Sequence, residues 1–220
     1  MVKLAWDETG KRLYETGTDR GVLALQTGDG AYSAPLAWNG LTKVTESPDG
    51  GEETALWANN GKYLSLLSTE NFKGTIEAYT YPEEFSKADG SAEVVPGVLV
   101  GQQRRVPFGL AYRTLVGNDT VNNSYGYKLH FVWGAKVSPS ERAYETVNDS
   151  PSAITFSWAF NTTPVDVGEE GFEKTASFTI DSTKVDKAAL AEVETLLYGG
   201  ADAAPTFPTP QELLAIVKKA

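Results

Sequence analysis

Residues 124–133 read SYGYKLHFVW, and every second residue in this stretch is apolar. Successive side chains of an extended chain point to opposite faces, so this alternation predicts a strand with one buried face. Lys128 and His130 lie on its polar face. Its apolar face is formed by Tyr125, Tyr127, Leu129, Phe131 and Trp133. This is the clearest strand signal in the chain, and it favours a β fold.

Similar runs occur on both sides of this stretch, separated by Gly, Pro, Asn and Asp. ITFSWAFNTT begins at Ile154 and predicts a strand with an apolar face of Ile154, Phe156, Trp158 and Phe160. KTASFTID, from Lys174, does so with Ala176, Phe178 and Ile180. Shorter strands are expected at 21–26, 41–46, 75–81 and 108–117, the last buried on both faces. The predicted fold is therefore mainly β, a sandwich or barrel-like domain.

Two helices are expected to follow the strands. The first covers about 186–198: Asp186 caps its start, Gly199 ends it, and its apolar face is Leu190, Val193 and Leu197. The second begins after Thr209, with Pro210 at its first position and Glu212 completing a capping box. We expect residues 1–200 to form one β domain with a flanking helix. Residues 201–220 add a Pro/Ala linker and a short C-terminal helix.

The charge balance argues against tight binding of nucleic acid. The 220 residues carry a formal net charge of -10, whereas DNA and RNA are held by clustered Lys and Arg. The cationic part is 101–150, with 6 basic and 4 acidic side chains. No stretch is apolar for long enough to span a membrane, and no export signal opens the sequence, so we expect a soluble, unexported protein.

Few residues offer chemistry. The chain has no cysteine and one histidine, His130, which the strand pattern places on a polar sheet face. Adjacent glutamates, such as Glu169 and Glu170, could serve a glycosidase, but such pairs are more typical of solvated turns. We therefore expect no catalytic, cofactor or metal site. Carbohydrate binding stays open as an alternative, because flat rings stack on sugars and the burial of four aromatic residues is not fixed by the pattern: Trp38, Trp57, Tyr79 and Tyr81.

Several segments, taken in order, resemble the major tail protein, or tail tube protein, of long-tailed siphophages. They cover about residues 19–200 and comprise DRGVL (from 19), WNGLTKVTESPDGGE (38), AYTYPEEF (78), GQQRRVPFGLAYRTLVGND (101), GYKLHFVWGAKVSPSERAYETVNDSP (126), ITFSW (154), TTPV (162), TIDSTKVD (179) and LYG (197). Each segment alone is a weak motif. Their shared order and spacing carry the resemblance.

The resemblance implies a structural virion protein without catalytic residues. It implies homo-oligomeric, hexameric rings that stack into a tube and conduct double-stranded DNA into the host without holding it tightly. The implied partners are a tape measure protein inside the tube and tail terminator and distal tail proteins at its ends. Assembly would take place in the bacterial cytoplasm. An acidic bore would repel the phosphates of the passing DNA.

In that family a long loop or hairpin reaches the next ring. The candidates here are the turn-rich loop at 47–62, with Glu52, Glu53 and Trp57, and the segment at 82–97, with Glu83 and Glu84. Because identical acidic subunits repel one another, assembly needs local charge complementarity. The hypothesis is that Arg104 and Arg105 pair with those glutamates on a neighbouring subunit. The alternative is a surface ion pair within one chain.

Overall fold

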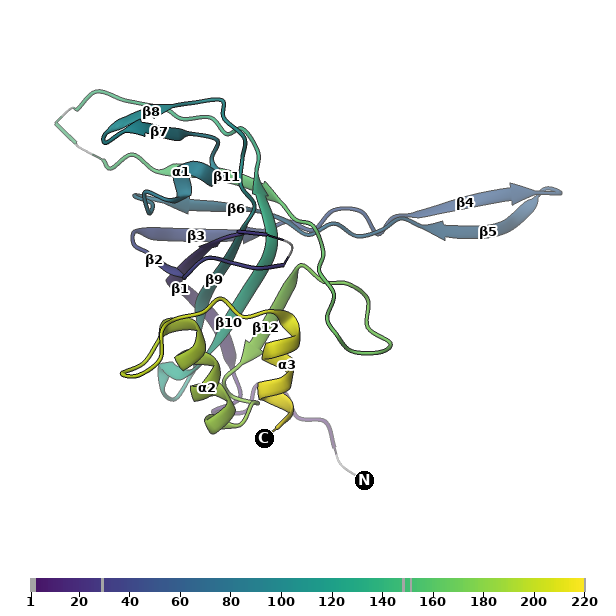
Figure 1. Ribbon diagram of the computed structural model, residues 1–220. Coiled ribbons are helices and arrows are strands. Elements are labelled where there is room, and N and C mark those ends of the chain that lie inside the picture. Colours follow the sequence, from purple (N-terminus) through teal and green to yellow (C-terminus); the bar gives the residue numbers. More distant parts are fainter. Residues whose placement is uncertain (1–2, 29, 148, 151, 220) are drawn as a thin grey trace.

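The computed structural model describes residues 3–28, 30–147, 149–150 and 152–219. It is mainly β, which confirms the predicted fold class. Within the described residues, eight strands form the main sheet, in the order β2-β1-β9-β10-β11-β6-β3, with β12 paired to β10 (Figure 1). They are β1 (Leu13–Leu25), β2 (Leu36–Trp38), β3 (Leu41–Glu46), β6 (Lys73–Ala78), β9 (Phe108–Asn118), β10 (Asn122–Val137), β11 (Phe156–Asn161) and β12 (Ser177–Asp181).

The stretch SYGYKLHFVW, which predicted a β fold, lies in β10. This strand is the longest of the sheet and lies at its centre. β10 pairs with β9 along most of its length, with β12 over Lys128–Val132, and with β11 at Lys136 and Val137. The change of partner occurs at Gly134, whose φ is +60°. A Cβ there would lie 2.5 Å from the carbonyl oxygen of Thr163, so only glycine fits this bend.

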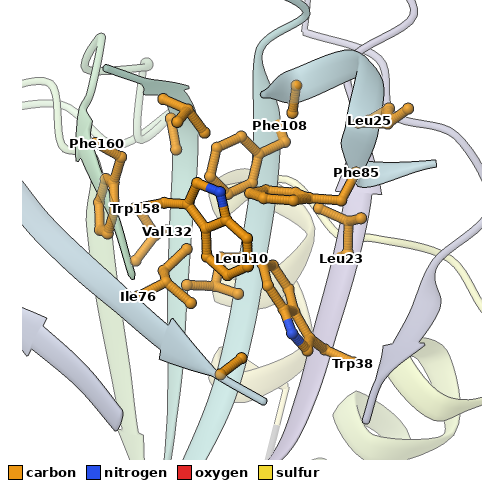
Figure 2. Packing of buried hydrophobic residues seen from close by; sticks show 14 of the residues in the cluster. Leu23, Leu25, Trp38, Ile76, Phe85, Phe108, Leu110, Val132, Trp158 and Phe160 are labelled. Carbon is orange, nitrogen blue, oxygen red and sulfur yellow. The ribbon is translucent and has the colours of Figure 1, made fainter. Parts of the chain in front are cut away.

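One face of the strands encloses an aromatic core (Figure 2). The Trp158 ring makes T-shaped contacts with Phe85 and Trp38, whose ring centroids lie 5.0 and 5.9 Å, respectively, from that of Trp158. Phe108 and Phe160 complete the cluster. Each large side chain buried in this way stabilises the fold by roughly 1.5–3 kcal/mol.

The other face of β1, β9 and β10 is covered by α2 (Lys187–Tyr198) and α3 (Pro210–Lys218) (Figure 1). The helix ends are as predicted: the Asp186 carboxylate accepts from the amides of Ala188 and Ala189, and Thr209 and Glu212 form the capping box. Leu213 and Ile216 of α3 are buried with Phe131 in this second core. β9 therefore has apolar neighbours on both faces, as expected. None of the helices in the described part of the chain is long and apolar enough to cross a bilayer.

Several sequence predictions need correction. The strand expected at 21–26 begins at Leu13, and the one expected at 75–81 ends at Ala78. Ile154 is exposed outside β11, because β11 pairs with β6 from Phe156 opposite Ala78 and has no partner strand before that point. Tyr125 is also exposed rather than part of the core.

Two hairpins and a short helix lie where no regular structure was predicted. The region 47–62 is not a loop: most of it belongs to a hairpin of β4 (Glu53–Ala58) and β5 (Gly61–Leu67). The segment 82–97 contains the single-turn helix α1 (Phe85–Ala88) and β7 (Ala92–Val95), which pairs with β8 (Val98–Val100). Phe85 of α1 is fully buried in the aromatic core, which explains why so short a helix is held in place.

Candidate functional site

The β4–β5 hairpin, called the arm below, extends away from the body of the molecule (Figure 1). It prolongs the β3–β6 pair, since the Ser47 amide donates to the Lys73 carbonyl at 2.8 Å and the Asp49 amide to the Asn71 carbonyl at 2.9 Å. At this junction Gly50 has a φ of +88° and comes so close to Thr69 that a Cβ would lie 2.4 Å from its carbonyl oxygen. The arm is therefore anchored to the sheet at its base.

The arm turns back at Asn59 and Asn60, whose φ values are +50° and +60°. Two successive residues with positive φ match the right-handed twist of a two-residue hairpin, and asparagine tolerates this conformation. The same ANNG sequence predicted a turn, but nothing in its immediate surroundings predicted two paired strands.

The two faces of the arm differ in chemistry. The cross-strand pairs Thr54–Leu66 and Leu56–Leu64 make one face almost entirely apolar. On the opposite face, Lys62 and Ser65 donate hydrogen bonds to the Glu53 carboxylate, and these bonds lower the pKa of the Glu53 carboxyl. The large apolar side chains of the arm are 38–76% exposed: Leu56, Trp57, Tyr63, Leu64, Leu66 and Leu67.

This exposure sets the arm apart. A two-stranded hairpin is marginal in water by itself, and a contiguous apolar surface usually marks an interaction site. Both faces of the arm carry such side chains, and the described part of the chain covers neither of them. The arm is the best candidate for a binding element.

A second apolar hairpin, β7–β8, lies on the opposite side of the molecule from the arm (Figure 1). Its turn is Pro96-Gly97, with Gly97 at a φ of +84° and its amide donating to the Glu93 carboxylate at 2.8 Å. Its apolar side chains are 44–67% exposed: Val94, Val95, Val98, Leu99 and Val100. This hairpin is a second apolar surface open to a partner.

Arg104 and Arg105 lie a few residues after β8 and line a shallow groove of about 380 Å³ with Gln26 and Gly28. Arg105 is half-buried beside Gly90, and its Nε atom is buried with no hydrogen-bond partner among the described residues. Among the residues that the structure describes, neither arginine forms an ion pair. The alternative of an ion pair within one chain therefore finds no support in the described residues.

Arg113, the third arginine of that segment, behaves differently. It makes a bidentate contact with Asp19 at 2.7 and 2.6 Å and lies over the Tyr127 ring, 5.1 Å from its centroid. The hydrogen bonds from Arg113 lower the pKa of the Asp19 carboxyl. The charge of Arg113 is thus paired within the chain, whereas no ion pair with a described residue involves Arg104 or Arg105.

The predicted interface residues fall into two separate groups. Glu52, Glu53 and Trp57 lie on the arm or at its base. Glu83 and Glu84 lie at the start of α1, on the same side of the molecule as the two arginines, since the Val106 amide donates to the Lys87 carbonyl of α1. Within one chain the structure thus does not bring the arginines to the arm.

Sequence reasoning missed most of the apolar residues on the two hairpins, although the run EVVPGVLV at 93–100 was visible as a signal. It also missed a groove of about 880 Å³ at the base of the arm, lined by Leu67, Glu70, Phe72 and Glu173, among others. This groove depends on contacts between distant segments, so no local pattern could have indicated it.

His130 lies in a hydrogen-bonded cluster between strands. Its Nε2 is 2.9 Å from the Thr114 hydroxyl, and its ring stacks on Tyr112 with centroids 4.7 Å apart. Tyr112 donates a 2.5 Å hydrogen bond to Glu46. Burial lowers the pKa of His130, which keeps the imidazole neutral at physiological pH. In the described residues no three His, Cys, Asp or Glu side chains are grouped to hold a metal ion.

Comparison with known proteins assigns no function to these surfaces. No protein-family model matches the chain, and no curated protein matches it.

Proposed function

We propose that this chain is a structural virion protein, the self-assembling subunit of a siphophage tail tube. Copies would form hexameric rings that stack into a hollow tube, through which double-stranded DNA passes during infection. The observation that carries the proposal is the arm, an anchored hairpin whose exposed apolar side chains have no cover within the described chain. The proposal assigns no catalytic step and no cofactor to the protein.

The arrangement of the exposed surfaces supports assembly into an extended polymer rather than a closed dimer. The arm and the β7–β8 hairpin are different surfaces on opposite sides of the molecule. When one patch binds a different patch on the next copy, the contact repeats around a ring or along a filament. The outermost strands of the main sheet, β2 and β3, add edges at which backbone groups could pair with a neighbour.

The acidity of the subunit fits a conduit for DNA. With a formal net charge of -10, the wall of a tube would repel phosphates, which carry about one charge per 1.7 Å of duplex. A tube of this kind would also enclose a tape measure protein before ejection and end against terminator and distal tail proteins.

Electron microscopy of the purified protein at rising concentration tests the proposal. We expect rings or hollow filaments of uniform diameter, together with a sedimentation coefficient that increases with concentration. A species that stays monomeric at millimolar concentration, with no particles on the grid, would contradict it.

A carbohydrate-binding module is the second candidate, because Trp57 and Tyr63 expose large flat rings on the arm. Titration with a panel of glycans, followed by Trp fluorescence and compared with Trp57→Ala, separates the two functions. Saturable glycan binding by a permanently monomeric protein would favour the module.

A further inference from the structure

We infer that the surface around Arg104 and Arg105 binds the base of the arm of a second copy, in a contact that joins two different surfaces. This inference rests on the proposed self-assembly and adds the identity of the receiving surface. It starts from the two arginines, which lie in a chain rich in acid and yet have no carboxylate partner among its described residues.

Unpaired carboxylates gather at the base of the arm. Glu52 and Glu70 are exposed and form no ion pair in the part of the chain that the structure describes. The neighbouring acids Glu53 and Asp49 are already bound by Lys62 and Lys73. The free acidic charge of this region therefore belongs to Glu52 and Glu70.

Glu70 also lines the 880 Å³ groove between the arm and the segment before β12, together with Glu173 and Lys174. Among the residues that line it, Glu70 and Glu173 against Lys174 leave one negative charge. Glu52 adds a second negative charge nearby, since its amide donates to the hydroxyl of Ser68 in the lining. Arg104 and Arg105 bring two positive charges. A second copy that inserts its arginines here would neutralise both surfaces, and guanidinium groups bind carboxylates with two parallel hydrogen bonds.

The apolar surfaces agree with this pairing. Leu67 of the arm lines the groove and is the most exposed leucine there, at 76%. On the other copy, β8 ends at Val100, only a few residues before Arg104, so its exposed valines accompany the arginines. The contact thus combines apolar and charged side chains from both copies, as specific interfaces do.

The same geometry distinguishes between the acidic residues predicted from the sequence. Glu83 and Glu84 lie on the arginine side of the molecule, beside the segment that they would have to bind on another copy. A contact between opposite sides needs acids on the arm side, which favours Glu52 and Glu70.

Two charge-reversal variants test the pairing. One carries Arg104→Glu and Arg105→Glu; the other carries Glu52→Arg and Glu70→Arg. The concentration at which each assembles should rise about tenfold or more, because like charges would then face each other. An equimolar mixture should assemble again, since each reversed surface meets its complement on the other variant. Sedimentation and electron microscopy give the readout, and circular dichroism checks that each variant is folded.

Glu83→Arg with Glu84→Arg is the matched control, and mixing it with the arginine variant should restore nothing. If Arg105→Glu disturbs the packing beside Gly90, then Arg104→Glu alone, mixed with Glu52→Arg, repeats the test. Variants that assemble as readily as the wild type would overturn the pairing while the tube proposal stands. A wild type that forms no polymer would overturn both.

Discussion

Trp158 and Trp57 show how differently one residue type is used in the body and in the arm. Trp158 is 1% exposed and contacts the rings of Phe85, Phe156 and Tyr81, whereas Trp57 is 71% exposed. The body buries its apolar side chains within one chain, whereas the arm leaves its own exposed, which is the surface that the proposed assembly would cover. One sequence can thus hold both a buried aromatic core and a large exposed apolar surface, because the latter is confined to hairpins that project from the fold.

Replacing Trp158 by alanine should have the largest effect on the stability of the isolated chain. Trp158→Ala removes an indole from the aromatic core and leaves a cavity, which costs about 3–5 kcal/mol of stability. The free energy of unfolding, measured by denaturant titration of monomer at low concentration, should fall by that amount. A loss below about 1 kcal/mol would show that the aromatic core does not hold the body together.

Glycines give a second comparison between body and arm. In Gly109→Ala the new Cβ would lie 2.4 Å from Cε1 of the buried Phe207, so the C-terminal segment must shift, at a cost of about 1–3 kcal/mol. Gly61→Ala, at the tip of the arm, meets nothing closer than 3.9 Å and should leave stability unchanged. Thermal unfolding of both variants checks this; equal melting temperatures would argue against the tight packing of residues 206–216 on β9.

The effect of pH on the stability of the body should be smaller than the effects of Trp158→Ala and Gly109→Ala. Burial lowers the pKa of His130, so below the ordinary histidine pKa of about 6.5 the unfolded chain binds a proton that the folded chain resists. The contribution of His130 to the free energy of unfolding is complete above a pH of about 6.5. It is lost as the pH falls towards the lower pKa that His130 has in the folded state. Glu46 and Glu15 act in the opposite direction, and Lys128 in the same direction.

Wild type and His130→Asn, compared by thermal unfolding between pH 7.5 and 5.5, give the measurement. The melting temperature of the wild type should decrease more steeply with falling pH than that of the variant. Parallel curves would mean that the histidine titrates in the folded protein as it does in the unfolded chain.

Only a small change in the stability of the isolated chain is expected from Trp57→Ala. Its side chain is mostly solvated, so the free energy of unfolding should stay within about 0.5 kcal/mol of the wild type. Assembly should weaken about tenfold or more, because aromatic anchors dominate interface energies. If this variant assembled as readily as the wild type, the aromatic side chain of Trp57 would not contribute to the contact between copies.

What could be predicted from the sequence follows the range of the interactions. Asp186, Gly199 and Thr209 were placed correctly because capping depends on residues within one turn of the helix. Leu129 and Phe131 were predicted as core because strict alternation needs a buried face. Such local patterns were enough for the mainly β fold class and both long helices.

The exposed surfaces of the two hairpins and of Arg104 depend on long-range arrangement, for which the sequence is less informative. The turn at Asn59 and Asn60 was visible, but the short runs on either side of it do not reveal that the hairpin projects from the fold and leaves its apolar side chains exposed. Nor does a sequence reveal that Arg113 meets Asp19, 94 residues away, while Arg104 meets no acid in the described chain. Whether a charge is free is decided by the fold.

Hydrogen exchange of the arm amides, at concentrations below and above the onset of assembly, tests the central claim most directly. In the monomer we expect the amides of 53–67 to exchange rapidly while those of β9 and β10 stay protected, because the arm has no layer packed on it. In the polymer the arm amides should become protected while the rest of the pattern changes little. An arm that is as protected in the monomer as in the polymer, or unprotected in both, would contradict the claim that a second copy completes it.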